Sequence, residues 1–330
     1  MSSPSPLTST GTRPASTSKD AGGSHRDVGV FLAIVFALPW MLWVLEQASG
    51  IHILFIAAPV CVAIATFVAA RWVWRPASIS RATSLVPIRP AGRLLRFCLL
   101  AIAIFLSASI LTVALNALTG LYPADLTSFS LLRHDFAPQT MGQAGFPFDV
   151  ALAALAANLL QFALILPLMF YEEWGWRGYL LNRLRDRLGT WPALIAIGLI
   201  CGAWHLPFFV GPWFSMGPDA RQTVIPFTIF CTLFGVLLGL LRLASGSIWP
   251  AVAGHAVNNT LVTGFVQVLV ADNDAKTNAW LTGLSGWQGW LVLLAAITIL
   301  TSTGIVARAN RDRLASTPDN PPHSRESDPR

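Results

Sequence analysis

The chain has 330 residues, of which 54% are hydrophobic and only 12% are charged, and its formal net charge is +6. Soluble domains carry about twice that charged fraction, so the composition excludes an ordinary soluble domain. The basic excess does not indicate nucleic-acid binding, because the Lys and Arg residues lie in loops beside apolar runs, as in membrane proteins. The sequence predicts an all-α, polytopic transmembrane helical bundle in the cell membrane, with the lipid bilayer as a partner and no nucleic acid.

Eight apolar runs reach or approach the roughly 20 residues that a membrane-spanning helix needs. They are expected at about 28–46, 51–73, 94–118, 148–171, 191–210, 223–243, 247–270 and 286–307. The fourth run should continue as helix beyond Tyr171, because no strong breaker occurs before Gly189. The polar tails over residues 1–27 and 308–330 are rich in small, polar and Pro residues and are expected to be disordered.

The distribution of positive charge predicts an orientation. Nineteen of the 22 Lys and Arg residues fall in alternate compartments, and only Arg133, Arg221 and Lys276 fall in the others. The positive-inside rule therefore predicts eight spans with both termini cytoplasmic. The four cysteines lie in apolar segments without metal-type spacing, and they are interpreted as packing residues.

The stretch "YEEWGWRGYLL" places two carboxylates and an arginine at the end of the fourth apolar run. Glu173 and Arg177 are one helical turn apart and can form an ion pair. Glu172 is rotated by about 100° from Glu173, so it is expected to be freer to act. The alternative is an interfacial helix end with solvated charges, which the flanking aromatic residues would also fit.

Two later spans carry further polar side chains. His205 precedes Leu206 and Pro207, where a kink can free a backbone carbonyl as its partner. A single histidine on an apolar helix is, however, more often a packing residue. His255 and Asn259 are one turn apart, so the amide could hold the histidine tautomer or donate to an oxyanion, or the two could simply bridge helices.

These groups can meet at one depth. At about 1.5 Å per residue, Glu172, His205 and His255 lie roughly 18, 20 and 12 Å from the cytoplasmic ends of their helices. That places all three in the cytoplasmic half of the membrane. A carboxylate that takes a proton from water, with histidine and amide groups around a tetrahedral intermediate, is chemistry suited to hydrolysis. No Gly-x-Ser-x-Gly and no His-Glu-x-x-His motif occurs, which argues against a serine hydrolase and an ordinary zinc protease.

The order Glu-Glu-x-x-x-Arg, then a histidine before Leu-Pro, then His-x-x-x-Asn resembles the CPBP family of intramembrane proteases. This is the CAAX prenyl protease and bacteriocin-processing group, also called Abi. The matching stretch runs from about Leu160 to Thr260. By resemblance Glu172 is the water-activating carboxylate, supported by Glu173 and Arg177, and His205, His255 and Asn259 complete the catalytic set. Cys201 stands where the second motif usually has an aromatic residue.

The resemblance implies an endopeptidase that cuts membrane-embedded or lipid-anchored peptides, including prenylated CAAX-type peptides. It allows a divalent metal such as zinc, with Glu172, His205 and His255 as the candidate ligands. It divides the chain into variable N-terminal transmembrane helices over 28–147, a protease core over 148–270 and a last transmembrane helix over 271–307. The sequence does not select between CAAX processing and peptide maturation or immunity, and it does not give the oligomeric state.

Two other functions compete with the protease. A non-catalytic immunity or scaffolding protein of the same fold would need none of the site residues, all of which are present. A transporter or channel could use buried polar residues as an ion path. It would be expected to carry comparable polar clusters in both halves of the chain, whereas the first three spans carry none.

Overall fold

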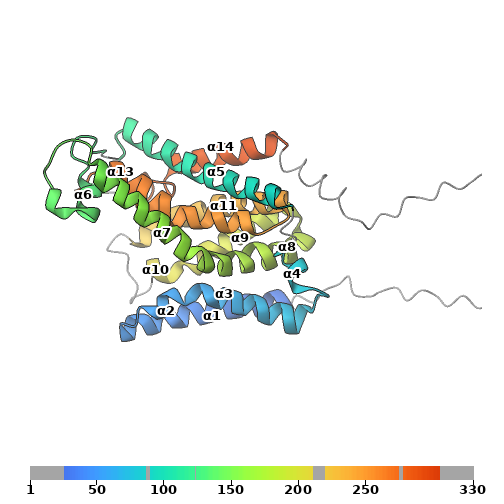
Figure 1. Cartoon of the computed structure of the whole chain (residues 1–330). Helices are drawn as coiled ribbons and strands as arrows, with labels where there is room; N and C mark the ends of the chain where they lie inside the picture. The colour runs from blue at the N-terminus through green and yellow to red at the C-terminus, as the bar shows by residue number, and fades with distance from the viewer. Residues whose placement is uncertain (1–25, 87–89, 123, 211–219, 275–277, 305–330) are drawn as a thin grey trace, which may run out of the picture.

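The computed structural model describes residues 26–86, 90–122, 124–210, 220–274 and 278–304. These residues form a bundle of helices (Figure 1), and the single β-pairing among them is an isolated bridge between Ala124 and Ala271. The predicted all-α bundle is therefore confirmed. The tails predicted to be disordered lie outside the described residues, except that Arg26 and Asp27 begin the first helix.

Long helices alternate with short connecting ones along the chain. In chain order they are α1 (Arg26–Ser49), α2 (Ile53–Ile56), α3 (Ala58–Val68), η1 (Ala69–Trp74), α4 (Ile79–Ala82), α5 (Ala91–Leu118), α6 (Ser130–Phe136), η2 (Pro138–Thr140), α7 (Phe148–Glu173), η3 (Trp174–Leu180), α8 (Leu181–Leu188), α9 (Thr190–Trp204), α10 (Leu206–Val210), α11 (Ala220–Ser245), α12 (Trp249–Val257), η4 (Asn258–Val266), α13 (Gln267–Val270) and α14 (Trp287–Ser302).

Five described helical segments are long and apolar enough to cross a membrane. They are Arg26–Ser49, Ile53–Trp74, Ala91–Leu118, Phe148–Leu188 and Ala220–Ser245. The chain is thus a multi-pass membrane protein. The shorter apolar helices α9 and α14 have 15 and 16 residues, and the expected seventh span is helical over α12, η4 and α13. The count of eight spans and the cytoplasmic termini stay predictions.

The fourth apolar run continues as helix, as predicted. Phe148–Leu188 is 41 residues long, although it contains Gly175 and Gly178. Both glycines are needed for packing rather than for backbone freedom. A Cβ on Gly175 would overlap the side chain of Val62, and one on Gly178 would lie 2.8 Å from the carbonyl oxygen of Thr83. Close approach to α3 and to the end of α4 therefore holds the segment that carries the two carboxylates.

Small residues also let α9 and α11 approach each other closely. A Cβ on Gly198 would overlap the backbone of Thr232, and one on Gly202 would meet Thr228. On α11, Gly235 faces Gly198 and Arg177. Such small-residue contacts are the usual means by which membrane helices pack. They bring the end of α9, where His205 lies, against α11 and next to η3.

Candidate active site

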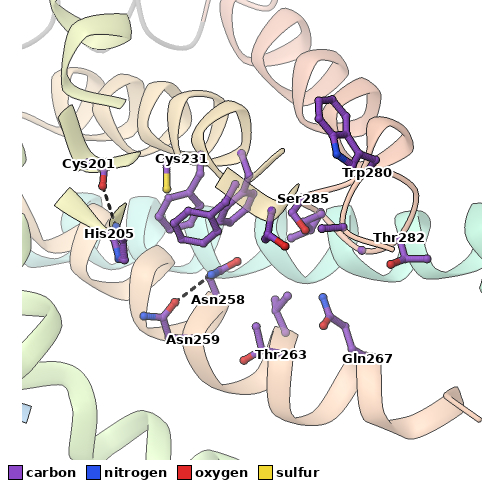
Figure 2. A pocket seen from close by; sticks show the side chains of 18 of the residues that line it. Cys201, His205, Cys231, Asn258, Asn259, Thr263, Gln267, Trp280, Thr282 and Ser285 are labelled. Atoms are coloured by element: carbon purple, nitrogen blue, oxygen red, sulfur yellow. Dashed lines mark hydrogen bonds between the residues drawn. The ribbon is translucent and has the colours of Figure 1, made fainter. Parts of the chain in front are cut away.

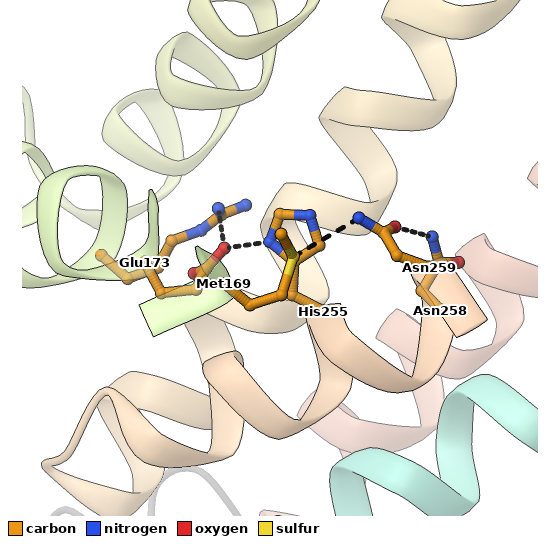
Figure 3. A network of polar contacts seen from close by, with 6 residues as sticks. Met169, Glu173, His255, Asn258 and Asn259 are labelled. Atoms are coloured by element: carbon orange, nitrogen blue, oxygen red, sulfur yellow. Dashed lines mark hydrogen bonds and ion pairs between the residues drawn. The ribbon is translucent and has the colours of Figure 1, made fainter. Parts of the chain in front are cut away.

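Glu173 is the acceptor that joins two of the predicted motifs (Figure 3). Its Oε1 accepts a hydrogen bond from Nη1 of Arg177 at 2.7 Å and one from Nδ1 of His255 at 2.8 Å. The Glu173 and Arg177 side chains are 0% and 3% exposed. The pairing predicted from their one-turn spacing is confirmed. The contact with His255 joins residues 82 positions apart, and only packing of α7 against α12 creates it.

Glu172 lies on a different side of the helix and lines a cavity of about 760 Å³. The same cavity is lined by His205, His255 and Asn259, so the four residues predicted to surround the reaction lie around one space. Glu172 is itself 7% exposed. Glu172 therefore borders the cavity, whereas Glu173 does not line it and instead binds His255. The alternative of a solvated interfacial helix end does not fit two buried carboxylates.

Departures from α-helical geometry follow directly after two of the motifs. The π-helix η3 begins at Trp174, immediately after the two carboxylates, and the π-helix η4 begins at Asn258, one turn after His255. Single π-turns in helices are frequent at functional sites, because they rotate side chains away from the regular spacing. Here the π-geometry changes the directions in which the side chains after Glu173 and after Val257 point.

His205 lies where α9 ends and α10 begins. Its backbone N–H donates to the carbonyl of Gly202 rather than to that of Cys201. Its Nδ1 donates to the carbonyl oxygen of Cys201 at 2.7 Å. The break before Leu206 and Pro207 thus frees a carbonyl for the histidine, as the sequence predicted. Because Nδ1 carries the proton, the neutral ring keeps its lone pair on Nε2. The rings of Trp204, Phe208 and Phe227 surround the imidazole.

Asn259 does not hold the tautomer of His255, contrary to one prediction. The Glu173 carboxylate does so, because it accepts the Nδ1 proton and leaves the lone pair on Nε2. The amide of Asn259 instead donates to the sulfur of Met169 at 3.4 Å and accepts from Asn258 (Figure 3). The π-geometry that begins at Asn258 explains why the one-turn spacing did not produce the expected pair. A thioether is a weak acceptor, so this amide can exchange Met169 for a stronger partner.

The donors proposed for a metal do not form a metal site in this conformation. Among the described residues, no group of three or more His, Cys, Asp or Glu side chains is placed so that it could hold a metal ion. Glu172, His205 and His255 share a cavity without converging on one point. A tetrahedral zinc site needs ligand distances of about 2.0–2.3 Å to a common centre. Glutamate and histidine donors suit zinc, but in this conformation their positions do not converge on a bound cation, and the divalent metal stays a prediction.

Sequence reasoning missed several residues that shape the site. Met169 contacts Asn259, yet a methionine in an apolar run gives no sequence signal. Cys201 and Cys231 line the cavity as buried free thiols, which agrees with their interpretation as packing residues without a disulfide. Polar residues from distant segments, such as Gln267 and Thr282, extend the cavity beyond the motifs (Figure 2). None of these has a spacing that would have identified it.

One family of known proteins matches the part of the chain that carries the three motifs. A family model described as type II CAAX prenyl endopeptidase Rce1-like matches residues 152–261. No curated protein matches the chain. The matched segment lies within the predicted core and contains Glu172, Glu173, Arg177, His205, His255 and Asn259. Over residues 152–261 the chain is therefore similar to the Rce1-like type II CAAX prenyl endopeptidases, in agreement with the resemblance that the order of its three motifs indicated.

Proposed function

We propose that the chain is an intramembrane endopeptidase in which Glu172 activates the attacking water. The observation that carries this proposal is the shared cavity, which Glu172, His205, His255 and Asn259 all line. A family of proteases matches the same segment. Together they favour hydrolysis over a scaffold, because a scaffold has no need for a water-accessible space around these residues.

The roles follow from the donors and acceptors. The carboxylate of Glu172 takes a proton from water as the water oxygen attacks the carbonyl carbon of the peptide. His205 and His255 both donate through Nδ1, so either neutral ring can offer Nε2 as the acceptor for the second proton of the water that Glu172 activates. The amide of Asn259 leaves Met169 and donates to the oxyanion. Glu172 then gives its proton to the leaving nitrogen as the carbon–nitrogen bond breaks.

Glu173 and Arg177 are positioning residues in this scheme. The buried carboxylate fixes the tautomer and the orientation of His255, and Arg177 balances its charge. Because the described donors do not converge on a metal position, no step is assigned to a metal ion. A chelator tests that assignment directly.

The experiment is cleavage of a mixed membrane-peptide library, with and without prenylated cysteine, by the purified protein in liposomes. Glu172→Gln and His255→Phe should abolish or strongly reduce cleavage. Glu46→Gln is the matched control, since Glu46 is also buried but bonds Gln47 and His52 away from the cavity. Cleavage by Glu172→Gln at the wild-type rate would overturn the proposal. Loss of wild-type cleavage in chelator would show that a metal takes part.

A further inference from the structure

The lining of the cavity includes both buried and exposed residues. Glu172, Trp176 and Arg177 are buried. Asn278 and Trp280 are exposed. Figure 2 shows Cys201 and His205 at one side of the space and Trp280, Thr282 and Ser285 at the far side. The reacting groups are therefore reached from the segment that precedes α14.

That segment lies at one end of the bundle, which we call the cavity end. The side chain of Asn116, near the C-terminus of α5, donates to the carbonyl of Leu281, and Gly283 donates back to it. Tyr122 donates to the carbonyl of Gln267 at the start of α13. The C-terminal end of α5 thus meets the loop before α14, and Tyr122, just after α5, reaches the start of α13, on the side where Figure 1 shows α6 and α13.

The opposite end is closed by contacts between arginines and the ends of other helices, and we call it the basic end. Arg183 of α8 pairs with Asp27 at the start of α1 at 2.6 Å and stacks over Trp74. Arg242, at the end of α11 and 2% exposed, donates to Ser84 and to Asn182 of α8.

Charge separates these two ends sharply. Among the described residues, the basic end holds the acidic residues Asp27 and Asp186 against ten arginines, namely Arg26, Arg71, Arg75, Arg81, Arg93, Arg96, Arg183, Arg185, Arg187 and Arg242. The described cavity end holds two arginines, Arg133 and Arg221, with the acidic residues Asp125, Asp135, Asp149, Asp272 and Asp274. Arginine and lysine are retained on the cytoplasmic side of membranes, so the positive-inside rule predicts that the basic end faces the cytoplasm. The cavity end then faces the other side.

We propose that the substrate enters this cavity from the non-cytoplasmic side of the membrane. The inference rests on the proposed protease function and narrows its substrate class. The substrate is a peptide segment exposed on the outer side, as in an exported peptide or the outer part of a membrane protein. A prenylated cysteine held at the cytoplasmic surface meets the basic end, where Arg242 and Arg183 are tied to neighbouring helices. The site can lie in the cytoplasmic half of the membrane and still be reached from outside.

Thiol labelling tests which side the cavity end faces. Ser285→Cys and Ala279→Cys place a thiol in the cavity lining near its exposed part, and Asp186→Cys places one on an exposed position of α8. Each variant is compared with wild type, whose four native cysteines set the background. A membrane-impermeant maleimide on intact cells should label the two cavity-end variants at close to their permeabilised level. It should label Asp186→Cys only after permeabilisation.

The reverse pattern would overturn the proposal, because the cavity would then open to the cytoplasm. If a cysteine variant fails to accumulate, a protease-cleavable epitope fused after Arg330 reports the side of the C-terminus in the otherwise unchanged chain. The epitope should resist protease in intact cells and be lost in inside-out vesicles, and loss in intact cells would contradict the orientation. Neither readout needs catalysis, so failure of the protease proposal and failure of this one are distinguishable.

Discussion

Substitution of Glu173 should lower the stability of the protein, whereas substitution of the adjacent Glu172 should lower its cleavage rate. Glu173→Gln keeps the shape of the side chain but removes the charge that accepts from both Arg177 and His255. The arginine is then left as a buried cation without its carboxylate, since its side chain is only 3% exposed. Removing one member of a buried ion pair costs about 3–5 kcal/mol of stability.

The number of hydrogen bonds lost gives a similar estimate of the stability change in Glu173→Gln. Hydrogen bonds to charged groups contribute about 1.5–3 kcal/mol each, and Oε1 of Glu173 accepts two. The retained amide oxygen can still accept, so we expect a loss of about 3 kcal/mol in the free energy of unfolding. Glu172→Gln should leave stability nearly unchanged while lowering the cleavage rate about 10²–10⁴-fold, the usual contribution of a general base.

Thermal unfolding in detergent and peptide cleavage are measured on the same preparations. A double variant, Glu173→Gln with Arg177→Met, removes both charges and should recover part of the stability lost by Glu173→Gln alone, because the isolated buried cation is gone. It should not recover cleavage, since His255 still lacks its carboxylate. Equal loss of stability in Glu172→Gln and Glu173→Gln, with cleavage unaffected by Glu172→Gln, would refute the division of roles.

Three further predictions concern other parts of the molecule. In His205→Phe the new ring should pack among the same aromatic rings, but the carbonyl of Cys201 loses its donor, which should lower the free energy of unfolding by about 1–3 kcal/mol. The variant should also abolish cleavage, and unfolding and cleavage assays check the two effects. Gly198→Ala should destabilise the protein by about 1–3 kcal/mol in detergent unfolding, because its methyl group would overlap Thr232. The backbone amide of Ser128, with further hydrogen bonds, holds the pKa of Asp125 below its ordinary value of 3.8. The stability from this carboxylate is therefore complete above that value and lost as pH falls through the folded pKa, so Asp125→Asn should flatten the acid dependence of unfolding.

Local spacing was enough to predict the parts of the site that one helix contains. The one-turn separation of Glu173 and Arg177 fixes their distance wherever the segment is helical, and the pair forms as expected. The different direction of Glu172 follows from the 100° step between successive helical residues. The break at His205 could be expected because Pro207 cannot continue the helical hydrogen bonding. Composition likewise determined the membrane bundle, because a chain this apolar must satisfy its backbone within helices.

Contacts between helices were beyond the reach of the sequence. The bond from His255 to Glu173 and the contact of Asn259 with Met169 join residues 82 and 90 positions apart. They depend on how α12 and η4 pack against α7, and packing is set by the whole bundle rather than by a periodic pattern. Of the roles left open for Asn259, holding the tautomer of His255 is not found for this reason, since the π-geometry from Asn258 redirects the amide. The sequence by itself predicted which residues would carry the chemistry. The tertiary structure decided that Glu172 faces the cavity while Glu173 holds the histidine, because a buried cavity exists only where helices pack together.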